Sequence, residues 1–93
     1  MRKIEQTKQF KRDYKREAKG SNHQKLASEF TAVVTALVND QPLAEKHCDH
    51  ALTDDWKDHR DCHIKPDLVL IYRKPDQRVL QLVRLGSHSE LGI

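Results

Sequence analysis

The chain of 93 residues lacks any long apolar run. Its most apolar stretch, residues 68–72, is far shorter than the roughly 20 residues that a membrane-spanning helix needs. The N-terminus, MRKIEQTKQFKRD, turns polar at once and has no apolar core of a secretory signal. We therefore expect a cytoplasmic protein with no membrane contact.

Cysteine is also scarce, with only Cys48 and Cys62 in the chain. Without a secretory signal both are expected as free thiols, although the sequence alone leaves a disulfide open. Nearby histidines are good zinc ligands, but the spacing matches no zinc knuckle. Cys62 and His63 would also face opposite sides of a strand. We therefore expect no metal or other cofactor, with a small metal-binding module as an alternative.

The net charge of +3 is unevenly distributed. Residues 1–25 contain nine Lys/Arg and three Asp/Glu, whereas the remainder contains eight and eleven. Basic side chains share one sector of a helix expected over residues 7–19: Lys8, Lys11, Arg12, Lys15 and Lys19. Such a face suits the phosphates of a polyanionic partner or an acidic protein, and ordinary solvation explains it equally well.

The N-terminal half predicts a helical hairpin. Thr7 is a suitable N-cap for the first helix, and Gly20 is suited to end it. A second helix is expected over residues 23–38, where apolar residues recur at helical spacing. These are Leu26, Phe30, Val33, Val34 and Leu37. Ser21 and Asn22 form the expected turn, which makes the helices antiparallel, and His23 is expected at the surface.

The last third predicts three strands, over residues 57–64, 67–73 and 78–85, with short turns that give an antiparallel meander. In the third strand, Val83 and Leu85 are expected on the face opposite Arg84. Residues 40–57 form a long connection, and loops of this length are usually functional or disordered. Trp56 is expected to anchor it. Residues 1–6 fit either an edge strand or a frayed end.

No repeat, low-complexity tract or linker divides the chain, so residues 1–93 are expected to form one domain. The expected fold class is α+β, with the N-terminal helical hairpin packed on a small antiparallel β-sheet.

Titratable side chains flank the expected strands. His50, His63 and His88 come from three separate segments, Asp67 opens a strand, and Arg84 precedes His88 by four residues. If the strands pair as a meander, these positions can converge at one end of the sheet. Imidazoles donate and accept protons near neutral pH, and an arginine can bind an anionic phosphorane. The set therefore favours metal-free cleavage of RNA, in which a 2′-hydroxyl attacks the neighbouring phosphate.

Three blocks of sequence occur in order: HALTDDW, RDCHIKPD and RLGSHS. With them, essentially the whole chain resembles the YafQ branch of the RelE-type bacterial toxins. The resemblance implies a RelE-like, microbial RNase-like fold and a type II toxin that is an mRNA interferase, an endoribonuclease. Such toxins enter the A site of the 70S ribosome and cut the translated mRNA. The implied partner is a DinJ-like ribbon-helix-helix antitoxin, and operator DNA is bound only through that complex.

By position, the family's active-site residues fall on His50, His63, Asp67, Arg84 and His88. We hypothesise that His88 is the general acid and that either Asp67 or His50 is the general base. His63 and Arg84 would then hold the phosphate, and the basic helix face would contact ribosomal RNA.

The chain departs from the family near its end. In that family an aromatic residue often lies shortly after the final histidine. In this chain Gly92 lies near that position. Loss of a stacking ring would affect codon preference. The rival function within the same fold is a RelE/ParE-type toxin that binds a protein such as gyrase without cleaving RNA.

Overall fold

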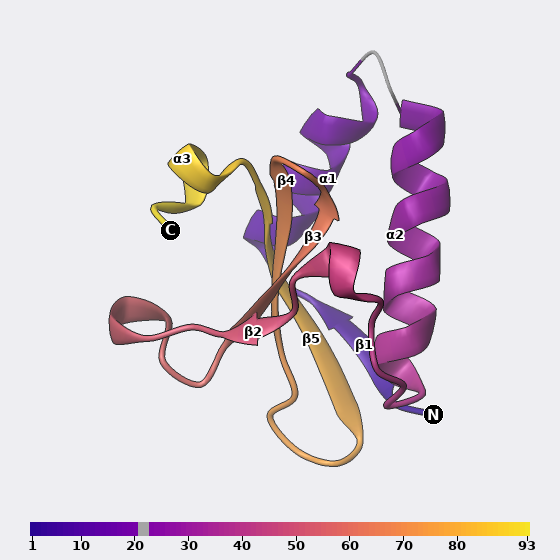
Figure 1. Ribbon diagram of the computed structural model, residues 1–93, viewed down its shortest axis with the longest axis vertical. Helices are drawn as coiled ribbons and strands as arrows, with labels where there is room; N and C mark the ends of the chain where they lie inside the picture. The colour runs from indigo at the N-terminus through magenta and orange to yellow at the C-terminus, as the bar shows by residue number, and fades with distance from the viewer. Residues whose placement is uncertain (21–22) are drawn as a thin grey trace.

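The structure, a computed structural model, describes residues 1–20 and 23–93 (Figure 1). The turn expected at Ser21 and Asn22, and the side chain of His23, lie outside the described residues. The elements follow the order β1 (Lys3–Gln6), α1 (Lys8–Ala18), α2 (His23–Val38), η1 (Glu45–His47), β2 (His50–Ala51), η2 (Asp54–Trp56), β3 (Arg60–Lys65), β4 (Leu68–Arg73), β5 (Val79–Gly86) and α3 (His88–Leu91).

The strands form one sheet in the order β1-β5-β4-β3-β2. The expected meander is present, because β3, β4 and β5 pair antiparallel in sequence order. β2 adds to the β3 edge, and β1 pairs with β5 in parallel at the other edge. The expected α+β fold is confirmed, and residues 3–6 resolve as an edge strand.

Both helices follow the expected boundaries closely. Thr7 caps α1, since its side chain accepts a hydrogen bond from the Phe10 backbone N–H at 2.9 Å. The apolar residues of α2 lie against the sheet, and Val33 and Leu37 are 1% and 3% exposed.

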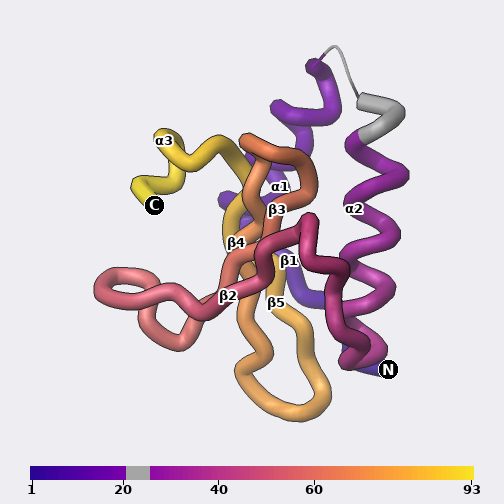
Figure 2. The backbone as a smooth tube through the Cα atoms, viewed as in Figure 1, coloured from indigo at the N-terminus to yellow at the C-terminus, as the bar shows by residue number. Residues whose placement is uncertain are grey.

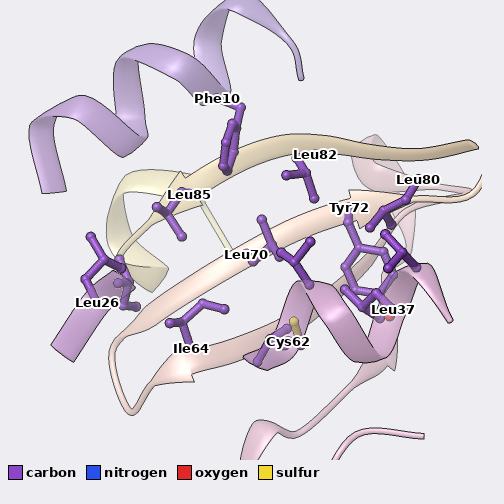
Figure 3. Packing of buried hydrophobic residues seen from close by; sticks show 14 residues of the cluster. Phe10, Leu26, Leu37, Cys62, Ile64, Leu70, Tyr72, Leu80, Leu82 and Leu85 are labelled. Carbon is purple, nitrogen blue, oxygen red and sulfur yellow. The ribbon is translucent and has the colours of Figure 1, made fainter. Parts of the chain in front are cut away.

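The helices and the sheet form two layers with the main core between them (Figure 3). Phe10 of α1 and Leu26 of α2 pack against Leu70 of β4 and Leu82 of β5, and all are at most 2% exposed. Three rings, those of Phe10, Tyr14 and Phe30, join α1 to α2 through contacts between neighbouring ring centroids at 5.0–6.1 Å. Apolar burial therefore occurs mainly on the helix side of the sheet.

Two details of the strands differ from the sequence expectation. The strand expected from residue 57 begins at Arg60, because η2 and a turn precede it and the Leu52 N–H donates to the His59 carbonyl at 2.9 Å. A register shift opposite Ile71 also changes the alternation in β5. Leu85 therefore lies in the core with Leu82, whereas Val83 packs on the opposite face.

α3 and the loop that contains η2 lie on the side of the sheet away from α2 (Figures 1 and 2). A smaller apolar cluster underlies them, formed by Val69, Ile71 and Leu91 with Leu52 and Trp56 packed against it. The expected anchoring role of Trp56 is consistent with this packing. In the described part of the chain, no helix is long and apolar enough to cross a membrane.

Candidate active site

The candidate site lies on the face of the sheet opposite α1 and α2, which is called here the open face. On β3, Cys62 and Ile64 point into the helix-side core, so the alternate residues Asp61 and His63 face the other way. The register then aligns His50 of β2 with Asp61 and aligns His63 with Val69 of β4. Strand alternation therefore places a carboxyl group and two imidazoles on one surface.

Asp61 is the buried centre of this surface, with 2% exposure. Its Oδ1 lies 2.9 Å from Nδ1 of His50, while that nitrogen also lies 2.8 Å from the Cys48 carbonyl oxygen. The Asp61 Oδ1 has no well-directed hydrogen bond within the described chain. Burial raises the pKa of Asp61, and the charges of the surrounding His50, His63 and His88 oppose that rise.

His88 completes the cluster from α3. Its ring meets that of His63 edge to face, with centroids 5.0 Å apart. Its Nδ1 lies 2.8 Å from Oδ1 of Asp67, and its backbone N–H donates to the same oxygen at 3.3 Å. These hydrogen bonds lower the pKa of Asp67, which is exposed. An ionised carboxylate only accepts, so the His88 Nδ1 carries a hydrogen and donates it.

The structure thus brings together four of the five residues expected at the site: His50, His63, Asp67 and His88. Arg84 lies in the same row of the sheet, since its Cα pairs with Ile71, which pairs with Asp61. Its guanidinium, however, donates from Nε and Nη2 to Asp13 of α1 at 2.8 and 3.4 Å. Arg84 is therefore held by the helix layer.

Asp13 is fully buried and accepts hydrogen bonds from several groups. The Leu85 backbone N–H donates to it at 3.1 Å, and Gln9 and Arg16 donate at 3.1 and 3.3 Å. Burial alone would raise the pKa of Asp13, but the hydrogen bonds from Arg84, Leu85 and Gln9 lower it overall. The carboxylate therefore remains charged and fixes α1 to the end of β5.

The expected basic face is exposed on α1, in the helix layer, whereas the histidines lie on the open face. Its members are Lys8, Lys11, Arg12, Lys15 and Lys19.

Two buried carboxylates were not expected from the sequence. Asp61 could have been found by the alternation of β3, because it precedes His63 by two residues and therefore shares its face. Asp13 has a weaker signal. Its spacing of three and four residues from Arg16 and Gln9 permits helical contacts, but nothing in the sequence indicates the contact with Arg84, 71 residues away.

Both cysteines are free thiols, as expected, and Cys62 is fully buried in the core, which raises its pKa. Cys62 and His63 face opposite sides of the sheet, also as expected. Within residues 1–20 and 23–93, no three His, Cys, Asp or Glu side chains are grouped so as to hold a metal ion.

Comparison with known proteins adds relatives of the whole chain. A family model described as a bacterial toxin of a type II toxin–antitoxin system, YafQ, matches residues 2–92. The mRNA interferase toxin YafQ of Escherichia coli strain K12 is 35% identical over 91 residues, or 97% of this chain and 95% of the relative.

Solved structures give the same result. A copper-bound mutant toxin from Helicobacter pylori has a TM-score of 0.90 and 40% identity, covering 98% of this chain and 99% of the other. YafQ in the E. coli DinJ–YafQ complex has a TM-score of 0.79 and 33% identity, covering 98% of each chain. Because the sequence match and the structural similarity both extend over nearly all of the chain, the protein belongs to the YafQ family of toxins of type II toxin–antitoxin systems.

Proposed function

We propose that this protein is a ribosome-dependent endoribonuclease that cleaves mRNA by metal-independent attack of a 2′-hydroxyl group. The observation that carries this proposal is the meeting of three imidazoles, from β2, β3 and α3, around the buried carboxyl of Asp61. Such a surface offers groups that can accept one proton and donate another near neutral pH. The name of the E. coli relative, an mRNA interferase toxin, supports the substrate.

His88 is the proposed general acid, which protonates the leaving 5′-oxygen. Its Nδ1 is held by Asp67, so Nε2 is the atom that would meet the substrate. Asp67 therefore acts in this scheme as a positioning residue for His88.

His50 is the better candidate for the general base, because Asp67 is already engaged with His88. The Nδ1 of His50 bonds to the Cys48 carbonyl, which leaves Nε2 to accept the proton of the 2′-hydroxyl. The nearby Asp61 would stabilise the imidazolium that results. His63, beside His88, would donate a hydrogen bond to the phosphate.

Arg84 is also proposed to bind the scissile phosphate. Asp13 takes the Nε–Nη2 edge of its guanidinium, so a phosphate would meet the Nη1 edge or displace the carboxylate. In either case Asp13 would control how far the arginine reaches over the open face.

The proposed partners follow from the family and from the two layers of the molecule. A DinJ-like antitoxin is proposed because the E. coli relative forms a DinJ–YafQ complex. The exposed lysines and arginine of α1 would contact ribosomal RNA phosphates while the open face meets the mRNA in the A site. Operator DNA would be bound only through the complex with the antitoxin.

The test is cleavage of a translated message by purified protein, mapped by primer extension with and without ribosomes and with a chelator present. His88→Ala should lower the single-turnover rate by about 100-fold or more, whereas Ser89→Ala, an exposed neighbour on α3, should cut normally. If His88→Ala cleaves at the wild-type rate, His88 is not the general acid. If the wild-type protein leaves messages intact but inhibits gyrase, the protein-binding alternative is correct.

A further inference from the structure

A hollow of about 600 Å³ lies between the η2 loop and the C-terminal residues after α3. This volume falls within the roughly 300–1,000 Å³ typical of ligand pockets. The hollow is lined by Leu52, Thr53, Asp54, Asp55, Trp56, Leu91, Gly92 and Ile93. In Figures 1 and 2, the loop and α3 project on the same side of the molecule.

The hollow adjoins the histidine cluster through two short connections. Leu52 follows His50 by two residues, directly after β2, and it packs against Val69 and Ile71 on the open face. Leu91 follows His88 by one helical turn, and the Ile93 backbone N–H donates to the His88 carbonyl at 3.1 Å. An RNA strand with its scissile phosphate at the histidines would therefore have a neighbouring nucleotide at this hollow.

The walls suit a flat ring better than a phosphate. Trp56 is half-buried and backed by the apolar cluster of Val69, Ile71 and Leu91, and the His59 ring contacts it edge to face at 5.4 Å. The indole is thereby fixed in position, with part of it exposed to solvent. Such a supported aromatic ring is a stacking platform for an unpaired base.

Charge narrows the choice of base. Asp54 and Asp55 are exposed carboxylates at the rim, which repel phosphate and accept hydrogen bonds from N–H donors. Exocyclic amino groups of adenine, cytosine and guanine supply such donors, whereas uracil has no amino group and offers only its ring N3–H. At Gly92, a Cβ would have no neighbour within 4 Å, so that wall leaves space for the edge of the base.

We propose that this hollow binds an unpaired nucleobase that bears an exocyclic amino group, stacked on Trp56 and contacted by Asp54 or Asp55. The inference rests on the proposed function, because it makes the hollow a specificity subsite for the message next to the scissile phosphate. Trp56 is then a specificity-determining residue in addition to its role in packing.

Trp56 is the only tryptophan in the chain, so its fluorescence reports directly on this hollow. The probes are uncleavable pentanucleotides with 2′-O-methyl groups at every position, containing only adenine, only cytosine or only uracil. We expect the adenine and cytosine probes to quench the fluorescence and to bind about ten-fold more tightly than the uracil probe. No quenching by any probe, or equal binding of all three, would overturn the proposal.

The paired variant Asp54→Asn/Asp55→Asn keeps the fluorescent ring and should reduce the ratio between the adenine and uracil probes toward one. Asp58→Asn is the matched control, because Asp58 is an exposed carboxylate of the same loop outside the hollow, and it should keep the wild-type ratio. An unchanged ratio in the paired variant would contradict the role of the carboxylates.

Cleavage mapping separates this inference from the proposed function. Trp56→Phe should retain the wild-type distribution of cut sites, whereas Trp56→Leu should weaken the base preference beside the cut about ten-fold. Identical cut sites in both variants, with normal cleavage, would overturn the subsite and leave the endoribonuclease intact. Failure of the wild-type protein to cut any message would instead remove the proposed function.

Discussion

The two faces of the sheet use the same strands for opposite purposes. Toward the helices, Leu70, Leu80 and Leu85 are fully buried and pack in a continuous apolar core. On the open face, His50 and His88 keep 56% and 39% of their side-chain surface exposed beside a buried carboxyl, that of Asp61. Alternation along β3 separates these environments by a single residue, so stability and proposed chemistry can be altered independently.

The largest expected effect is on the open face. His50→Ala and His63→Ala should each reduce single-turnover cleavage by about 100-fold or more. Because both rings are partly exposed, the urea midpoint should move little. If either variant loses much stability but still cleaves normally, the open face does not serve cleavage separately from stability.

On the helix side, Leu70→Ala should lower the free energy of unfolding by about 2–5 kcal/mol, because Leu70 is fully buried at the centre of the sheet. Urea unfolding followed by circular dichroism measures this change. The residual folded protein, corrected for its population, should still cleave RNA at the wild-type rate. A matched Val79→Ala substitution, on the less buried start of β5, should cost much less.

Asp13 is a charged residue on the helix side, where the other buried residues are mainly apolar, so its replacement tests whether a polar group there serves stability. Asp13→Asn should lower the free energy of unfolding by about 1.5–3 kcal/mol, since hydrogen bonds to a buried charged group are lost. It should also release Arg84, which a change in the salt dependence of RNA binding would detect. Glu5→Gln, at an exposed carboxylate of β1, is the control for the same change in charge.

Asp61 should give a smaller effect of opposite sign on stability. Its raised pKa means that ionisation is less favourable in the folded state, so stability falls as pH rises from 3.8 through the folded pKa. Asp61→Asn removes this loss and should raise the thermal midpoint at pH 7 while slowing cleavage. The opposite result would be a thermal midpoint of Asp61→Asn that is below the wild-type value at pH 7 and equal to it at pH 3. It would indicate that the ionised carboxylate stabilises the fold.

The smallest effect is expected far from both faces, at the exposed pairs of Asp40 with Lys74 and Arg2. Hydrogen bonds from these two side chains lower the pKa of Asp40 to about 2. The stabilisation from these pairs is therefore complete above pH 3.8 and is lost as pH falls through about 2. Carboxyl NMR titration should show the low pKa, and Lys74→Gln should move it toward 3.8 without affecting cleavage.

Local patterns predicted the elements well where they were repeated over several turns or strands. The helical spacing of apolar residues from Leu26 to Leu37 gave the span of α2, and Pro-containing turns gave the meander. The cluster of His50, His63 and His88 followed from that meander together with the family resemblance. The spans of the helix and the strands depend on short-range signals that one segment carries by itself.

Features that depend on distant partners were not predictable in the same way. β1 is too short to be identified without its pairing to β5, and the face of Leu85 depends on a bulge that residue types do not reveal. The contact of Arg84 with Asp13 likewise depends on how α1 docks. In each case the deciding interaction joins residues far apart in the sequence.

The parallel pairing of β1 with β5 has a consequence for how the protein is made. Residues 3–6 leave the ribosome well before Gly86, which completes the strand beside them. His88 follows still later, on α3. A nascent chain therefore carries an unfinished sheet and an incomplete set of imidazoles until β5 and α3 have both been made. The proposed active site cannot assemble from a chain that stops short of His88.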